Sequence, residues 1–347
     1  MSDTDRRPWA DMARGFAIVT VVFFHVAITL DSGGQVDWKV WLLINLFAPI
    51  PIALFFFVSG LFSRKVVVGG WSAGLGRRLI GLLYAFVVWS IIEAITRFVL
   101  TGLVPRPDVW RYLLDPESTL WFVWALAIFT FGAHLAWTRW PGPTVALTMV
   151  ASSLSFSGMI TVDSFVYENL LRFAPFFLLG LAVPSLEARV AGQRWLVASG
   201  GAVAYAALTV LATYAVPSGW AGAVLAAMTW ISIPTSIAGC MLVSRMPLLG
   251  GIVQWLGRNS LGIYLGHPVA IMLLAAALRS VWTQGGAPLF LPVFALTLPA
   301  LFASAAFYWL AVRSGVTALY VPPFRARRPR SGRKTDQDTP TGLAPPV

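Results

Sequence analysis

Residues 13–30 read ARGFAIVTVVFFHVAITL, an apolar stretch with one arginine near its start and one histidine inside it. A helix crosses the hydrocarbon core of a bilayer with roughly 20 apolar residues, so this stretch is long enough to form a span. Its apolar run is longer than that of a signal peptide, and no small-residue cleavage site follows Leu30. We therefore expect these residues to remain in the protein as a membrane helix that carries Arg14 and His25.

The composition of the whole chain extends this prediction. Of the 347 residues, 58% are hydrophobic, which is about 201 residues and enough for about ten spans, and only 11% are charged. Soluble domains have roughly 25% charged residues, so a soluble globular enzyme is excluded. Because an open strand in lipid would leave backbone groups unsatisfied, we predict an all-α polytopic integral membrane protein with about ten transmembrane helices. The ten apolar segments are 13–30, 38–62, 78–100, 119–136, 143–160, 169–185, 195–215, 220–243, 260–281 and 289–312.

The basic residues predict the orientation of these spans. If the N-terminus is cytoplasmic and the connections alternate, 19 of the 25 Lys and Arg residues lie inside and six outside, as the positive-inside rule requires. Both termini are therefore predicted in the cytoplasm, and we expect the plasma (inner) membrane of a bacterium. The predicted domains are a cytoplasmic N-terminus at 1–12, a ten-helix membrane domain at 13–315, and a basic, Pro-rich disordered cytoplasmic tail at 316–347. The six outside residues are Lys39, Arg97, Arg106, Arg111, Arg172 and Arg279.

The net charge of +11 does not indicate nucleic-acid binding. Seven of the 25 basic residues lie between Arg313 and Lys334, beyond the last apolar segment, where a basic tail meets anionic membrane lipid. The single cysteine, Cys240, excludes an internal disulfide, and three histidines leave little material for a metal site. We expect no metal, no permanently bound cofactor and no nucleic-acid partner.

Arg14 and His25 are eleven residues apart on the predicted first helix. At 100° per residue this spacing is about 20° beyond three full turns, so both side chains lie on one face, roughly 16 Å apart along the axis. Arg14 is then at the inner rim of the membrane and His25 near its centre, where an ionisable side chain indicates a functional site. The alternative is a structural histidine that bonds to a neighbouring helix.

The Arg14–His25 spacing resembles the signature of membrane-bound acyltransferase family 3, the O-acyltransferases of cell-surface glycans. Other stretches resemble motifs of the same family, and they occur in the family's order over about residues 8–315. The short N-terminus and compact loops resemble the fucose O-acetylase-like branch. The matching stretches are DMARG at 11–15, FFFVSGLF at 55–62, LWF at 120–122, FFLLG at 176–180 and LGRNSLGIYLGHP at 256–268.

This resemblance implies ten core helices, an acyl-CoA donor that enters from the cytoplasm, and a carbohydrate or lipid-linked sugar acceptor near the outer face. It also implies that His25 is the catalytic histidine, and a neutral histidine suits a general base that takes the proton of the acceptor hydroxyl. Arg14 at the rim is predicted to hold phosphate of the acyl-CoA, because its planar fork matches phosphate geometry. We expect an O-acetyltransferase that uses acetyl-CoA as co-substrate and works in contact with membrane lipid.

Further candidate residues have two interpretations each. Arg77 and Arg78 begin the third segment and either anchor it on the cytoplasmic side or bind phosphate of the donor. The family often has two arginines three residues apart here, whereas these two are adjacent. Glu93 and Arg97 are spaced as a local ion pair, or they contact the acceptor sugar. Trp121 belongs either to an interfacial aromatic belt or to a stacking platform for a sugar ring.

Tyr264 and His267 are three residues apart and share a helix face. His267 either lines the same cavity as His25 or forms a hydrogen bond between helices. The residues predicted for the cavity or the acceptor site are Asp11, Ser59, Glu93, Trp121, Tyr264 and His267.

Two other classes of function compete with acyl transfer. A transporter or flippase of a glycan or lipid precursor agrees with Pro49 and Pro51, which interrupt the second segment, but the chain has no convincing internal repeat. A structural or polymer-assembly membrane protein would not require the Arg14–His25 geometry. Acyl transfer is therefore the preferred hypothesis.

Overall fold

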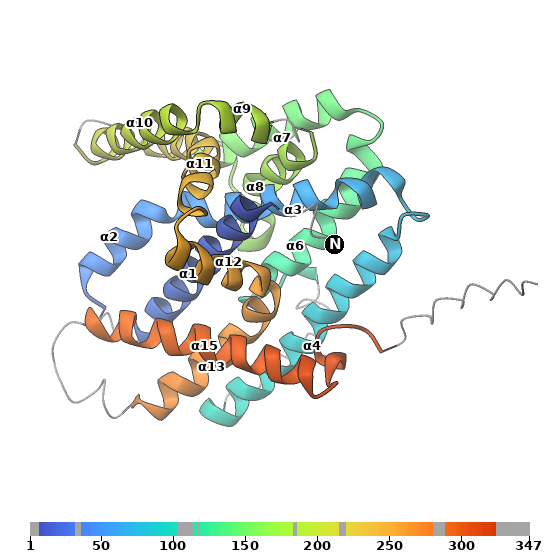
Figure 1. The fold of residues 1–347 in the computed structure, drawn as a ribbon, viewed down its shortest axis with the longest axis vertical. Helices are drawn as coiled ribbons and strands as arrows, with labels where there is room; N and C mark the ends of the chain where they lie inside the picture. The colour runs from blue at the N-terminus through green and yellow to red at the C-terminus, as the bar shows by residue number, and fades with distance from the viewer. Residues whose placement is uncertain are drawn as a thin grey trace, which may run out of the picture.

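The computed structural model describes residues 7–31, 36–102, 114–116, 118–182, 186–214, 220–279 and 289–323. Every regular element in these ranges is a helix, and the helices form one bundle in which they cross at varied angles (Figure 1). The elements are α1 (Pro8–Leu30), α2 (Trp38–Phe47), α3 (Pro49–Gly69), α4 (Leu75–Thr101), α6 (Trp121–Gly132), the π-helix η2 (Ala133–Trp137), α7 (Pro141–Phe156), α8 (Phe165–Ala182), α9 (Leu186–Gly192), α10 (Arg194–Tyr214), α11 (Ala221–Val243), α12 (Pro247–Arg258), α13 (Ser260–Ala277), α15 (Leu291–Arg313) and the 3₁₀ helix η4 (Thr317–Leu319).

Within the described residues, eight helical runs are long and apolar enough to cross a membrane, with α2 and α3 counted as one run. The predicted segment 119–136 forms α6 continued by η2, and the predicted segment 143–160 forms α7, of 16 residues; both are shorter than the other spans. The prediction of an all-α, multi-pass membrane protein is confirmed. Arg106, Arg111 and the basic residues of 325–334 lie outside the described residues, so the orientation of the termini stays a prediction.

The second predicted segment, 38–62, forms two helices instead of one. α2 ends at Phe47 and α3 begins at Pro49. A proline has no N–H for a bond to the preceding turn, so it begins a helix readily but does not continue one. α3 then extends beyond the predicted end to Gly69, with the charged Arg64 and Lys65 exposed on its last turns.

α12 is a helix that the hydropathy pattern does not predict. Its exposed residues include Leu248 and Ile252, while Gly257 is buried against α1. A Cβ atom added to Gly257 would collide with the backbone carbonyl of Asp11, which shows how closely the two helices approach. Small residues permit such contacts between membrane helices. α12 therefore supports the first turns of α1, where Asp11 and Arg14 lie.

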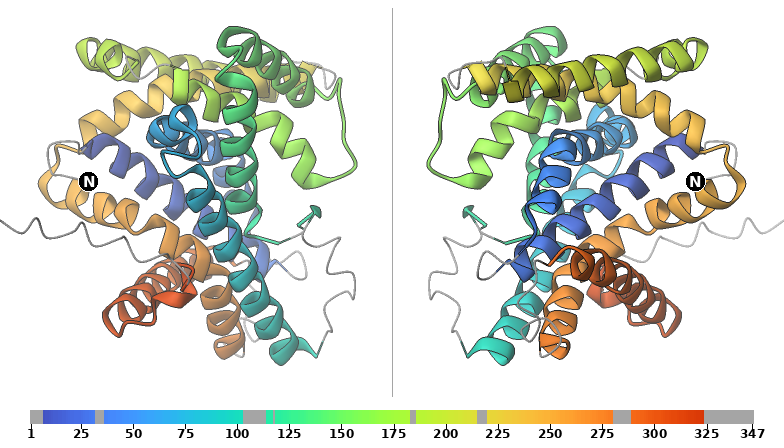
Figure 2. Two further views of the ribbon diagram at one scale, coloured as in Figure 1. Left: turned by 90° about the vertical axis from the view of Figure 1, so that its right-hand side faces the viewer. Right: turned by 90° about the vertical axis from the view of Figure 1, so that its left-hand side faces the viewer.

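α1 is the central helix of the bundle. It packs against α3, α11, α12, α13 and α15, and the side views show its N-terminal half between α11 and α12 (Figure 2). Among the described helices, α10 packs mainly on α11, with smaller contacts to α9, and it lies along one edge of the molecule. Because α1 contacts helices from both halves of the chain, side chains on α1 can meet residues that are far apart in the sequence.

Candidate active site

A cavity of about 440 Å³ lies beside His25, in the second half of α1. The wall that α1, α2 and α3 contribute is largely apolar and includes Ile28, Ile44 and Ile52. The opposite wall comes from the turn before α6, from α8 and from α13, and it carries hydroxyl and amide groups. His25 is half-buried at this cavity. The polar residues of the second wall are Ser118, Thr119, Asn169 and Tyr264.

Trp121 is a buried part of the cavity wall. Its ring meets Phe165 edge-on with centroids 5.8 Å apart, and it lies 6.4 Å from the ring of Phe173; both phenylalanines also line the cavity. Trp124, one helical turn later, instead packs on Tyr167 and does not line the cavity. An aromatic surface of this kind suits stacking against the apolar face of a ring.

Glu93 on α4 is buried and holds the turn before α6 in place. Its carboxylate accepts hydrogen bonds from the hydroxyls of Ser118 (3.1 Å) and Thr119 (3.0 Å), and it forms an ion pair with Arg97 (3.1 Å). Glu93 does not line the cavity itself, whereas Ser118 and Thr119 do. The predicted ion pair is therefore present, and the carboxylate orients two residues of the cavity wall, while contact of Glu93 with an acceptor sugar stays a prediction.

Two residues of α13 approach the same place from the other side. The Tyr264 hydroxyl donates a hydrogen bond of 2.7 Å to the carbonyl of Thr119, so α13 is tied to the same turn that Glu93 holds. His267 is fully buried, and its ring lies 5.1 Å from the ring of His25 and 5.4 Å from that of Tyr264, measured between centroids. The structure thus brings His25, Tyr264 and His267 together.

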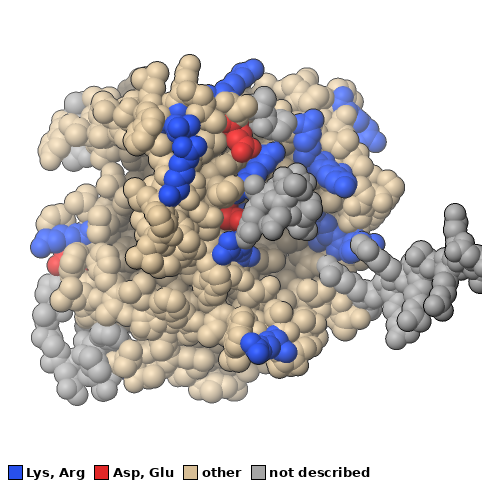
Figure 3. Space-filling model, in the orientation of Figure 1, with Lys and Arg blue, Asp and Glu red and all other residues tan. Residues whose placement is uncertain are grey.

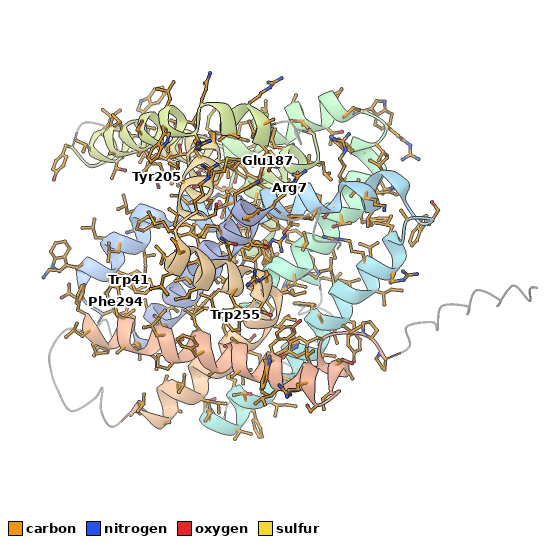
Figure 4. All side chains as sticks on the ribbon, in the orientation of Figure 1. Arg7, Trp41, Glu187, Tyr205, Trp255 and Phe294 are labelled. Carbon is orange, nitrogen blue, oxygen red and sulfur yellow. The ribbon has the colours of Figure 1, made fainter. Side chains whose placement is uncertain are left out.

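A second cavity, of about 920 Å³, lies at the opposite end of the α1–α3 pair. Arg7, Arg64 and Lys65 line it together with the ring of Phe62. Basic side chains gather over this part of the molecule, while the lower part of the same face carries few charges (Figure 3). Arg7 is also paired with Glu187 of α9, with 2.9 Å between the charged groups (Figure 4). We call this site the basic cavity and the site beside His25 the histidine cavity.

Arg14 lies between the two cavities along α1. Its guanidinium stacks over the ring of Phe62, 4.5 Å from the centroid; Phe62 lines the basic cavity, whereas Arg14 itself lines neither cavity. Asp11 is buried and lies 3.8 Å from Arg14 in an i,i+3 pair. Asp11 therefore orients Arg14 and is not part of the lining of either cavity.

Arg77 and Arg78 have different environments although they are adjacent. Arg78 points into the protein and donates a hydrogen bond of 2.7 Å to the hydroxyl of Ser63, which in turn donates to the carbonyl of Ser59. Arg77 is exposed. Ser59 does not line the histidine cavity and contributes here through its backbone.

The family of the chain follows from a comparison of its sequence with models of known protein families. The family model of the acyltransferase domain matches residues 7–309, which includes α1, both cavities and most of α15. The chain belongs to membrane-bound acyltransferase family 3. No curated protein and no solved structure has a significant match to it. The protein is therefore a membrane acyltransferase with multiple spans.

Two of the stretches that resemble family motifs are explained by packing in this acyltransferase. α3 and α8 cross where Gly60 faces Gly180: a Cβ atom on Gly60 would collide with the carbonyl of Phe177, and one on Gly180 with the carbonyl of Phe57. These glycines are the last residues of FFFVSG and FFLLG. The close crossing positions the first turns of α3 and α8, which both contribute to the histidine cavity.

Several residues that line the two cavities were not predicted as site residues. Asn169 and Ser118 line the histidine cavity, and Arg7, Arg64 and Lys65 line the basic cavity. Asn169 is an amide at the start of an apolar segment, a signal that could have identified it. The three basic residues have the same sequence pattern as ordinary inside anchors, so only the fold distinguishes them.

Proposed function

We propose that this acyltransferase is an O-acetyltransferase that moves an acetyl group from acetyl-CoA to a hydroxyl of a cell-surface carbohydrate or of a lipid-linked sugar. The observation that carries the proposal is the position of His25. It lies at a cavity with hydroxyl and aromatic walls, and the basic cavity lies at the other end of α3, beside the N-cap of α1. We therefore assign the histidine cavity to the acceptor and the basic cavity to the donor.

The donor fits the basic cavity by charge. Acyl-CoA carries phosphates at its nucleotide end, and the three cations of the basic cavity complement them. Its pantetheine arm is long and thin, so the thioester can reach far from the phosphates. Arg14 stacks on Phe62, which lines this cavity, and His25 lies roughly 16 Å further along the axis at 1.5 Å per residue. We propose that the arm follows α1 over this distance.

The acceptor fits the histidine cavity by shape and polarity. Trp121 offers a surface against which the apolar face of a sugar ring can stack, and Ser118 and Asn169 offer groups for its hydroxyls. The apolar wall with Ile28 and Ile44 suits the lipid side of a lipid-linked sugar or the acyl group. A carbohydrate hydroxyl placed at His25 would meet the donor thioester there.

The proposed reaction needs one proton acceptor and no further reagent. His25 takes the proton from the acceptor hydroxyl while the hydroxyl oxygen attacks the thioester carbonyl. The tetrahedral intermediate then collapses, the carbon–sulfur bond breaks, and the CoA thiolate takes the proton from His25. The products are the acetyl ester and CoA, and His25 returns to its neutral form.

The proposal includes a place in the cell. We propose the plasma (inner) membrane of a bacterium, with both termini cytoplasmic, because 19 of the 25 basic residues then lie inside. Reporters inserted after Gly34 and after Arg106 should report outside, and a reporter after Lys334 should report inside. A tail that reports outside would overturn this orientation.

The central experiment uses the purified full chain in lipid nanodiscs with radiolabelled acetyl-CoA. Surface glycans from cells with and without the gene are compared by mass spectrometry to identify the acceptor, which is then added to the nanodiscs. We expect transfer of label to that acceptor. A chain that binds acetyl-CoA but transfers nothing to any glycan fraction would contradict the proposal. A glycan that accumulates unmodified on one side of the membrane would favour the transporter hypothesis.

A further inference from the structure

His267 is followed by a proline inside α13, and this pair has a specific effect on hydrogen bonding. Pro268 has no N–H, so it cannot bond to the carbonyl four residues earlier, which belongs to Tyr264. The ring nitrogen Nδ1 of His267 lies 2.5 Å from that carbonyl oxygen. Because a carbonyl only accepts, Nδ1 must carry a hydrogen and donate it.

This hydrogen bond determines whether the other ring nitrogen, Nε2, carries a hydrogen. In a neutral imidazole with a hydrogen on Nδ1, Nε2 has none and is a hydrogen-bond acceptor. Nε2 of His267 is buried and has no hydrogen-bond partner. A buried acceptor without a partner is unfavourable and uncommon, so its presence needs a reason. The imidazole of His25 lies within 5.1 Å of that of His267, centroid to centroid.

We infer that His267 is a positioning residue for His25, and that its Nε2 accepts a hydrogen bond from the His25 imidazole during the reaction. The inference rests on the proposed function of His25 as the base. If one nitrogen of His25 donates to His267, the other has no hydrogen and is the one that takes the proton of the acceptor hydroxyl. His267 thus selects the tautomer and the orientation of the base, as a carboxylate does in hydrolase triads.

The proton balance of the reaction is unchanged by this contact. When His25 takes the acceptor proton it becomes an imidazolium, and Nε2 of His267 continues to accept its hydrogen bond without taking the proton. The CoA thiolate then removes the proton that came from the acceptor. His267 remains neutral throughout, since its Nδ1 hydrogen stays with the Tyr264 carbonyl.

Two substitutions separate this role from a structural one. His267→Asn keeps an N–H near the position of Nδ1, so it can still bond to the Tyr264 carbonyl, but it has nothing at the position of Nε2. His267→Gln reaches the position of Nε2 with an amide oxygen, which can accept a hydrogen bond from His25. We expect His267→Asn to lower kcat by about 10²-fold or more, within the usual range for acid–base catalysis, and His267→Gln to recover part of this loss.

Binding of the acyl-CoA donor should not change in either His267 variant. Both variants should bind a non-hydrolysable acetyl-CoA analogue with wild-type Kd, because the loss lies in the chemical step. The matched control is His134→Asn: the His134 ring also bonds through Nδ1 to a backbone carbonyl, that of Val67 (2.8 Å), but it does not line the histidine cavity. This control should keep the wild-type kcat.

The measurements are initial rates and titrations of protein in nanodiscs whose folding is checked by size-exclusion chromatography and thermal unfolding. Wild-type kcat in His267→Asn, or a His267→Gln no more active than His267→Asn, would overturn the inference. The proposed function fails separately: it fails if His25→Ala still transfers acetyl at the wild-type rate, whatever His267 does.

Discussion

The two cavities of this acyltransferase differ most in charge, although α3 contributes to both and Arg7 of the basic cavity directly precedes α1. The basic cavity has three cationic side chains in its lining. The histidine cavity has no Lys, Arg, Asp or Glu in its described lining, and its chemistry depends on one imidazole, hydroxyls, an amide and aromatic rings. Charge is inexpensive at the edge of a membrane and costly within it.

This difference suggests a division of labour along one helix. Phosphate recognition needs fixed positive charge, and we propose it for the basic cavity, where water can solvate the charges. Proton transfer needs a base that is neutral at rest, and a histidine meets this condition within an apolar bundle. Arg14 lies between the two sites, stacked on Phe62 and paired with Asp11. The following predictions test whether the basic cavity acts on donor binding and the histidine cavity on proton transfer.

The largest effect is expected for His25→Ala. This substitution removes the base, so kcat should fall by roughly 10²- to 10⁴-fold. Binding of the donor should stay within about twofold of wild type, because we propose that the donor phosphates bind at the other end of α1. Radiolabel transfer gives kcat, and isothermal titration with a non-hydrolysable acyl-CoA gives Kd. A variant that loses donor binding as strongly as turnover would remove the distinction between the two cavities.

Arg14→Ala should act on the donor instead. Loss of a charge-assisted contact worth roughly 1.5–3 kcal/mol weakens the Kd of acyl-CoA about ten- to a hundredfold. Arg14→Lys should recover only part of this affinity, because an ammonium group lacks the planar fork and stacks less well on Phe62. The same titration measures both variants. Unchanged donor affinity with lost turnover would instead assign Arg14 to the reacting centre.

Arg64→Ala and Lys65→Ala should have smaller effects on the donor, of about two- to fivefold in Kd for each, because both side chains are exposed to solvent. The effects should diminish as salt is raised, since exposed charges are screened. Arg245→Ala, an exposed arginine that does not line the basic cavity, is the matched control. Equal effects in the control would show that general surface charge, and not this cavity, attracts the donor.

The smallest functional effect is expected at the adjacent arginines. Arg78→Gln removes a partly buried hydrogen bond to Ser63, so it should lower Tm by a few degrees while donor Kd changes by about twofold or less. Arg77→Gln should change neither quantity, because Arg77 is exposed. Thermal unfolding and titration of the two purified variants compare them directly. A larger loss of donor affinity in Arg77→Gln than in Arg78→Gln would reverse this assignment.

The helices and the Arg14–His25 face could be predicted because they depend on local rules. Apolar length predicts spans, and the 3.6-residue period places side chains eleven apart on one face. An interruption between α2 and α3 could also be predicted, because Pro49 lacks the N–H that would continue the helix. The helix α12 could not be predicted from hydropathy. It has only 12 residues, and glycines and two polar residues interrupt its apolar residues.

The sequence by itself determined that this protein is an all-α membrane protein and that Arg14 and His25 share a face of one helix. It also determined the family, through short motifs spread along the chain. Only the tertiary structure decided which candidates meet: His267 lies beside His25, Glu93 holds the turn before α6, and Arg78 but not Arg77 points inward. The physical reason is that lipid is as apolar as a leucine side chain, so hydropathy places a helix in the membrane without selecting its neighbours. Those are selected by close glycine crossings and by buried hydrogen bonds between residues distant in sequence.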